Sequence, residues 1–411
     1  MLKKIYFSIL ILISLSIPIE TLLPYYFSVR SQIYYLSIIG LFFGLLHYKE
    51  IYKQLKQSKG LLLIIISFLI NILIYFVFPI RENDEYILIF QLILLCLIFI
   101  PFGINYKSRE KLIFSFWLGW VILIVLSLIY YASGNISTMT DRNLDLERVI
   151  SILGFSAAQH GAYVSTGLFT AIILALNEKK TSKRFFYILS ILIGSIVIFM
   201  TASRTALFSF FFLLTIFILV KLRAQKVFFL KKQLPILFII IISSLFIIFI
   251  TETGSNFFRT FAERVENLIQ LNDFSGRDSI YRAAFELVRR NPNILVIGLG
   301  HGNAQLAISS YLPVFSMGKD LHNYFLRFLI EGGLLSFTLF IIGLLFMIKN
   351  GWSWYKNSGE GYYLFPFILL LIISFGGRTF NYKILWFFLA FNTLTPMNLK
   401  NLKNITKIEN S

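Results

Sequence analysis

Apolar segments long enough to cross a lipid bilayer recur along the whole chain, and short polar connectors separate them. Because about 20 consecutive apolar residues span the hydrocarbon core of a membrane, this pattern predicts an all-α, polytopic protein of about twelve transmembrane helices. All 411 residues are expected to form a single membrane domain. The expected helices lie near residues 5–23, 32–47, 61–80, 86–102, 112–131, 150–176, 186–203, 205–220, 234–251, 323–348, 362–376 and 382–397.

The connectors alternate between two kinds of positive charge. One set is rich in lysine, as in 49–59 and 179–184, and includes the C-terminal tail. Because positively charged loops stay in the cytoplasm, the pattern places both termini there. The opposite, outer set carries mainly arginine: Arg30, Arg81, Arg142, Arg148, Arg204, Arg259, Arg264, Arg277, Arg282, Arg289, Arg290 and Arg378.

Topology requires only positive charge, so it does not account for the choice of arginine on the outer face. A planar guanidinium is suited to two-pronged recognition of phosphate or carboxylate. The alternative is that these arginines pair with neighbouring acids such as Asp278 and Glu286. Both explanations remain open for most of them.

One outer connector is far longer than the others. It runs over residues 252–321, between the ninth and tenth expected helices, and contains a helical stretch at 278–290. Loops of this length are usually functional or disordered. Its aromatic residues, interleaved with charges, predict an ordered cap on the outer membrane surface.

Composition narrows the function classes. Hydrophobic residues make up 57% of the chain and charged residues 14%, whereas a soluble domain carries about 25% charged residues. The net charge of +18 is expected to reflect topology and contact with membrane lipids, so we predict no binding of nucleic acid. Cys96 is the only cysteine of the sequence, so an intramolecular disulfide is excluded, and it lies in an apolar run.

Several polar residues interrupt the apolar pattern near the outer face. Arg204 lies in the turn of a predicted helical hairpin, where a charge close to hydrocarbon indicates function unless it reaches the lipid headgroups. Arg277 precedes the loop helix and could be presented with Arg282. Gln159 and its neighbour His160 are a polar intrusion in the sixth expected helix and could line a cavity.

Two histidines follow in the chain. His301 lies among alternating glycines at 297–303, where no nucleotide-binding pattern is present and a tight turn against the membrane domain is expected. His322 opens an expected helix that also contains Arg327 and Glu331. A histidine at the water boundary is suited to act as a base, or it could be a structural residue of the interface.

No cofactor or metal is expected. The four histidines show no ligand spacing, and no Asp-x-Asp pair stands on the outer loops. Activated nucleotides are scarce outside the cytoplasm, so a group transfer there would require a donor carried by the membrane.

The motifs together resemble the O-antigen ligase and O-antigen polymerase superfamily of bacterial membrane glycosyltransferases. The matching segments are residues 203–207, Gly276-Arg277 leading into 281–292, Gly298 to Gly300, and 322–326 with 331–333. The first 150 residues match only as a pattern of spans, and Tyr281 stands where a tryptophan is common in the family.

The resemblance implies transfer of a glycan from undecaprenyl diphosphate to an acceptor hydroxyl, with inversion and without metal. Arg204 and Arg277 match arginines that hold the diphosphate, and His322 matches a histidine near the acceptor. Arg282, His301, Gln159 and Arg378 are weaker candidates for binding diphosphate or glycan. The expected location is the bacterial inner membrane, with the active site facing the periplasm.

The acceptor is left open by these motifs. We predict a polymerase that acts on a growing surface polysaccharide, with a chain-length regulator as a further expected partner. A ligase acting on lipid A-core and a protein-linking transferase share the same motifs. A transporter for lipid-linked glycans is the alternative from another class, although the notable residues gather at the outer face and no two related halves are apparent.

Overall fold

The structure is a computed structural model of the full chain. It describes residues 2–19, 48–77, 85–100, 106–132, 138–140, 147–149, 157–201, 203–224, 277–311, 321–359, 361–377 and 379–393, together with single positions between 38 and 45.

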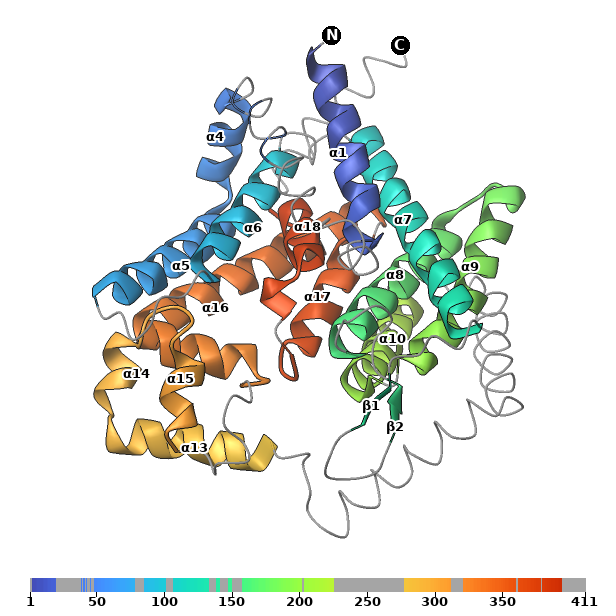
Figure 1. The fold of residues 1–411 in the computed structure, drawn as a ribbon. Helices are drawn as coiled ribbons and strands as arrows, with labels where there is room; N and C mark the ends of the chain where they lie inside the picture. Colours follow the sequence, from blue (N-terminus) through green and yellow to red (C-terminus); the bar gives the residue numbers. More distant parts are fainter. Residues whose placement is uncertain are drawn as a thin grey trace. The chain divides into compact units, whose positions relative to one another are not determined.

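The described part of the chain is helical apart from one short hairpin, which confirms the all-α prediction (Figure 1). Within the described ranges, six helices are long and apolar enough to cross a membrane, and three shorter apolar helices accompany them. The number twelve stays a prediction, because the expected helices at 32–47 and 234–251 fall largely or wholly outside the described residues.

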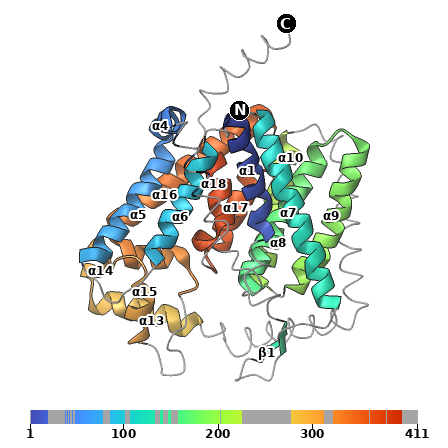
Figure 2. The same ribbon diagram turned by 45° about the horizontal axis from the view of Figure 1, so that its top comes forward.

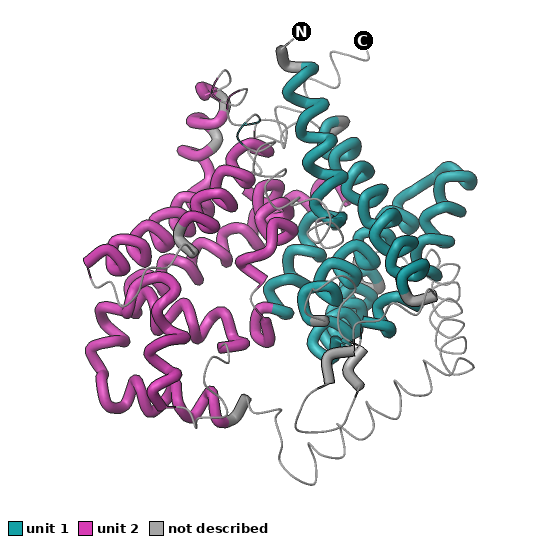
Figure 3. The backbone as a smooth tube through the Cα atoms, in the orientation of Figure 1, with its two compact units in different colours: residues 1–40, 105–265, 360–373 teal, residues 41–104, 266–359, 374–411 magenta. Residues whose placement is uncertain are grey.

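The chain divides into two compact units, which are described separately (Figure 3). Unit 1 contains residues 1–40, 105–265 and 360–373, and unit 2 contains residues 41–104, 266–359 and 374–411.

Unit 1 is built from six helices and the hairpin among its described residues. The hairpin pairs β1 (Thr138–Thr140) with β2 (Glu147–Val149) in antiparallel register, Met139 opposite Arg148. The sixth expected helix, 150–176, is described from Ala157 onward, while residues 150–156 of that prediction lie outside the described residues. The helices are α1 (Leu2–Ile19), α7 (Tyr106–Ala132), α8 (Ala157–Asn177), α9 (Thr181–Met200), α10 (Arg204–Ala224) and α17 (Leu364–Ile373).

Small residues allow the helices of unit 1 to approach closely, as is common between helices in membranes. Gly119 of α7 lies against the backbone of Leu15 in α1. The indole of Trp120 fills the space left by Gly167 of α8 and Gly194 of α9, and its Nε1 donates to the carbonyl of Val164 at 3.2 Å. The predicted hairpin around Arg204 is confirmed, since α9 ends at Met200 and α10 begins at Arg204.

Unit 2 is centred on the pair α5 and α16, which run side by side in both ribbon views (Figures 1 and 2). Gly60 and Gly343 allow this approach, and the hydroxyl of Ser336 donates to the carbonyl of Ser67 at 2.8 Å. An aromatic cluster around Phe68 fills the interior between them. The described helices of this unit outside the long connector are α5 (Lys59–Val77), α6 (Glu85–Phe99), α16 (Tyr324–Ser358), α18 (Lys383–Phe391), the amphipathic α4 (Tyr48–Gln57) and the 3₁₀ turn η4 (Thr379–Asn381).

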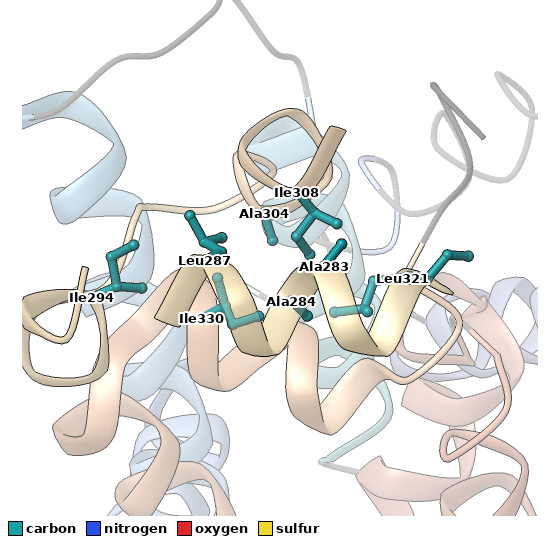
Figure 4. Close-up of a cluster of buried hydrophobic side chains, with 9 residues drawn as sticks. Ala283, Ala284, Leu287, Ile294, Ala304, Ile308, Leu321 and Ile330 are labelled. Atoms are coloured by element: carbon teal, nitrogen blue, oxygen red, sulfur yellow. The ribbon is translucent and has the colours of Figure 1, made fainter. Parts of the chain in front are cut away.

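Three short helices lie in the described part of the long connector at 252–321. They are α13 (Arg277–Arg290), α14 (Asn293–Ile297) and α15 (Ala304–Ser309), and we call them the cap. The loop helix expected at 278–290 is therefore present. Apolar residues of α13 and α15 meet in a buried cluster that also includes Leu321, which precedes α16, and Ile330 of α16 (Figure 4). The described cap is thus an ordered structure with its own apolar core.

Candidate functional site

Helix α16 is broken nine residues after its start. Gly333 has φ 65° and ψ −178°, so two helical segments meet there at a kink. A break inside an apolar helix frees backbone carbonyl groups, which need new hydrogen-bond donors because lipid supplies none. The φ at this position lies in the left-handed region, which glycine adopts more readily than other residues.

The glycine loop of the cap supplies those donors. The amide groups of Leu299 and Gly300 donate to the carbonyl oxygens of Ile330 and Glu331 at 3.0 and 2.8 Å. The expected tight turn at 297–303 against the membrane helices is therefore present. Gly298, Gly300 and Gly302 have φ values of 86°, 84° and 83°.

Gly300 can be tested against Gly359, a glycine with a similar φ value. A side chain at Gly300 would be forced into the backbone of Tyr75 in α5, whereas Gly359 has φ +77° and nothing lies within 4 Å of the point that a Cβ atom would occupy there. We expect Gly359→Ala to cost about 1–2 kcal/mol from left-handed strain alone. Gly300→Ala adds a backbone clash, so its cost should be larger by about 1–3 kcal/mol. Thermal unfolding in detergent measures both, and equal losses would contradict the close packing of the loop.

A buried charged cluster lies at the same break. Glu331 accepts a hydrogen bond from Nε of Arg327 at 2.7 Å, and its other carboxylate oxygen lies 3.4 Å from Nδ1 of His301. The exposed fractions are 1% for Arg327, 1% for Glu331 and 3% for His301. In the structure, therefore, His301 is a buried partner of Glu331, while its weaker expected role in binding substrate remains untested.

Asn71 of α5 also lies at this buried cluster. It was not identified from the sequence. Its carbonyl oxygen accepts from the amide of His301 at 3.2 Å. Its side-chain amide is fully buried, lies against Gly332, and makes no hydrogen bond to any part of the chain that the structure describes. A lone asparagine in an apolar run is the signal that could have marked it.

His322 is exposed and lies two residues before the start of α16. The next residue, Asn323, is the N-cap, and its side chain accepts from the amide of Leu326 at 3.1 Å. The amide of Tyr324 donates to the carbonyl of Ser374 at 3.0 Å. The position of His322 at the helix end is therefore fixed by the backbone on its C-terminal side.

The apolar core of the cap includes residues of α13 together with Leu321, the residue before His322. Leu321 belongs to the same buried cluster as Ile280, which lies one turn after Arg277. Figure 4 shows Leu321 beside the end of α13 nearest Ala283. Arg277 and His322 thus flank one apolar cluster, at the N-terminal ends of two helices.

Arg204 lies in unit 1, as the first residue of α10. Ser203 caps this helix, accepting a hydrogen bond from the amide of Ala206 at 3.4 Å. Gly161 of α8 packs on Ser203 so closely that a Cβ atom there would stand 2.5 Å from the Cβ of Ser203. The turn that carries Arg204 therefore packs closely against α8.

The two polar residues near the start of α8 differ in burial. His160 is buried, and its Nε2 lies 3.4 Å from the hydroxyl of Ser127 in α7. Gln159 is partly exposed. The packing of Gly161 on Ser203 brings this part of α8 to the turn of Arg204.

The other arginines of the predicted outer set have different surroundings. Arg289 and Arg290 both donate to Glu286 at 2.7 to 2.8 Å, and the bonds from Arg289 and then Arg290 hold the pKa of Glu286 down at about 2. Pairing with a neighbouring acid is therefore confirmed for these two. Arg282 is exposed, and Arg378 lies outside the described residues.

Comparisons with known proteins identify one segment of the chain. A family model described as O-antigen ligase matches residues 189–341, from α9 to the second segment of α16. This match confirms the predicted superfamily, and it includes Arg204, Arg277 and His322. Searches of curated proteins and of solved structures find no significant match.

Proposed function

We propose, from the O-antigen ligase domain at residues 189–341, that this protein is a polymerase of surface polysaccharide that takes its glycan from undecaprenyl diphosphate. The family match supports membrane glycan transfer in general. The donor, the acceptor and the residues that act are parts of the proposal.

One observation carries the assignment of residues. Arg204 is the first residue of α10, Arg277 is the first residue of α13, and His322 directly precedes the N-cap of α16. The N-terminus of a helix presents free amide groups and a partial positive charge, which favour anions such as phosphate. Guanidinium groups at two such positions suit a diphosphate, and the resemblance to the family points to the same three residues.

The reaction would be a single displacement at the anomeric carbon. The bond between that carbon and the diphosphate oxygen breaks while a bond to the acceptor oxygen forms, so the configuration inverts. Arg204 and Arg277 would stabilise the negative charge on the departing undecaprenyl diphosphate. His322 would accept the proton released by the acceptor hydroxyl.

The acceptor distinguishes the candidate functions. Purified protein in detergent is given a lipid-linked oligosaccharide donor, and the products formed without and with lipid A-core are compared. Lengthened lipid-linked glycan supports the polymerase, while glycan joined only to lipid A-core supports a ligase, which the description of the matching family favours. A donor that crosses the bilayer of a vesicle unchanged would support a transporter and contradict both transferases.

Topology provides a direct prediction. If the lysine-rich connectors face the cytoplasm, a cysteine at exposed Lys180 should resist a membrane-impermeant thiol reagent in intact cells, and one at exposed Arg289 of the cap should react. The native Cys96 is fully buried, so the unmodified protein supplies the background. Labelling at 180 without labelling at 289 would reverse the orientation and remove the site from the outer face.

Metal dependence is a separate prediction. Within the described ranges, no group of three or more acidic, histidine or cysteine side chains is placed to hold a metal ion. If the guanidinium groups supply the charge that a metal would otherwise provide, EDTA should change the transfer rate by less than about twofold. Loss of activity with EDTA and recovery with magnesium or manganese would show that a metal is required.

A further inference from the structure

We propose that Glu331 is a positioning residue for the transfer reaction: it latches the glycine loop of the cap to the break in α16, and so holds Arg277 and His322 in their working arrangement. This inference rests on the proposed function and adds a role for residues buried beneath the site.

Glu331 contacts both sides of the junction. Its carboxylate binds Arg327 within α16 and lies beside His301 of the glycine loop, while its own carbonyl oxygen accepts from the amide of Gly300. The side chain and the backbone of one residue therefore join the loop to the broken helix.

The junction is connected along the chain to both parts of the proposed site. The segment of α16 before the break begins next to His322. The loop continues through α14 into α13, whose first residue is Arg277. Ile330, the neighbour of Glu331, is buried in the apolar core of the cap. A shift of the loop along α16 would therefore move the two ends of the site relative to each other.

A buried ion pair such as that of Arg327 and Glu331 is costly inside a membrane segment, which favours a role beyond packing. Ionisable groups inside a membrane segment are rare and usually mark function. Replacing a buried ion pair with apolar residues of similar size is often neutral or stabilising. The backbone hydrogen bonds from Leu299 and Gly300 already satisfy two carbonyl groups at the break, those of Ile330 and Glu331. The ion pair is thus not required to close the break, and positioning of the loop accounts for it.

The first experiment compares Glu331→Gln with Glu286→Gln. Both variants remove a carboxylate that binds arginine, but Glu286 lies on the outer surface of α13. In Glu331→Gln we expect the amides of Leu299 and Gly300 to exchange with solvent about tenfold faster or more, as when a hydrogen bond to a charged group is lost. Turnover should fall by about 10²-fold, with the KM for the lipid-linked donor within about threefold of the wild type. The control should change neither exchange nor turnover.

A double variant separates positioning from stability. Arg327→Met with Glu331→Leu removes both charges and leaves no unpaired charge buried, so its melting temperature should stay close to that of the wild type. We expect faster exchange at Leu299 and Gly300 and low turnover in spite of this stability.

Wild-type turnover in the double variant would show that Glu331 is only structural. Slow exchange combined with low turnover would also overturn the proposal, since the loop would then be held without the carboxylate. If Glu331→Gln does not fold, the double variant still decides between these outcomes. A wild-type protein without transfer activity would contradict the proposed function, while the exchange measurements would still test the latch.

Discussion

Replacing His322 with alanine should lower turnover by about 10²- to 10⁴-fold, the contribution of a well-placed general base. The side chain is exposed, and it lies outside the apolar core that its neighbour Leu321 joins. The substitution should therefore leave folding and donor binding largely intact. Rates measured with lipid-linked donor, beside direct donor binding, distinguish this result from a general loss of structure.

Glutamine at the same position separates proton transfer from hydrogen bonding. An amide can orient a hydroxyl group but cannot accept its proton at neutral pH. Low turnover in both variants, together with a wild-type rate that falls at acid pH as imidazole becomes protonated, supports the base. Nearly full activity with glutamine would mean that His322 only positions the acceptor. Loss of donor binding in both variants would instead place His322 on the diphosphate.

The helical fold was predictable because apolar length is a strong signal. The hairpin at Arg204 and the helix at 278–290 were also correct to within a few residues. The predicted start of the sixth helix at residue 150 stays a prediction, because residues 150–156 lie outside the described residues and α8 is described from Ala157. Hydrophobicity sets which segments are buried, while the ends of helices depend on local backbone hydrogen bonds.

The candidate site was predictable only in part. Arg277 and His322 were identified separately, and only the apolar core of the cap shows that α13 and α16 begin near each other. The break at Gly333 was not predicted, since Gly332 and Gly333 interrupt the apolar pattern no more than glycines inside regular helices do. Its hydrogen-bond donors lie more than thirty residues earlier in the chain, so no local pattern records them.

Arg204→Lys should lower transfer by about 10²- to 10³-fold, as the loss of one donor to a developing charge does elsewhere. Lysine keeps the positive charge but loses the planar, two-pronged geometry that suits a diphosphate. The turn itself should be preserved, because Ser203 caps α10 and Gly161 packs on Ser203, and neither contact uses the guanidinium group. The measurement is the initial rate of transfer, with insertion and melting temperature compared in parallel.

Arg289→Lys is the matched control for this substitution. Arg289 is also an outer arginine at a helix end, but it is exposed and bound to Glu286, and exposed ion pairs contribute little. It should therefore keep nearly the full rate. If the Arg204 variant also transfers glycan at nearly the wild-type rate, Arg204 is a topological charge or reaches the lipid headgroups, and the diphosphate site must be formed by other residues. A specific diphosphate site requires Arg204 at the start of α10 but not Arg289 on the surface of the cap. If both variants lose activity to the same degree, the arginines act only through their positive charge, and the specific site is contradicted.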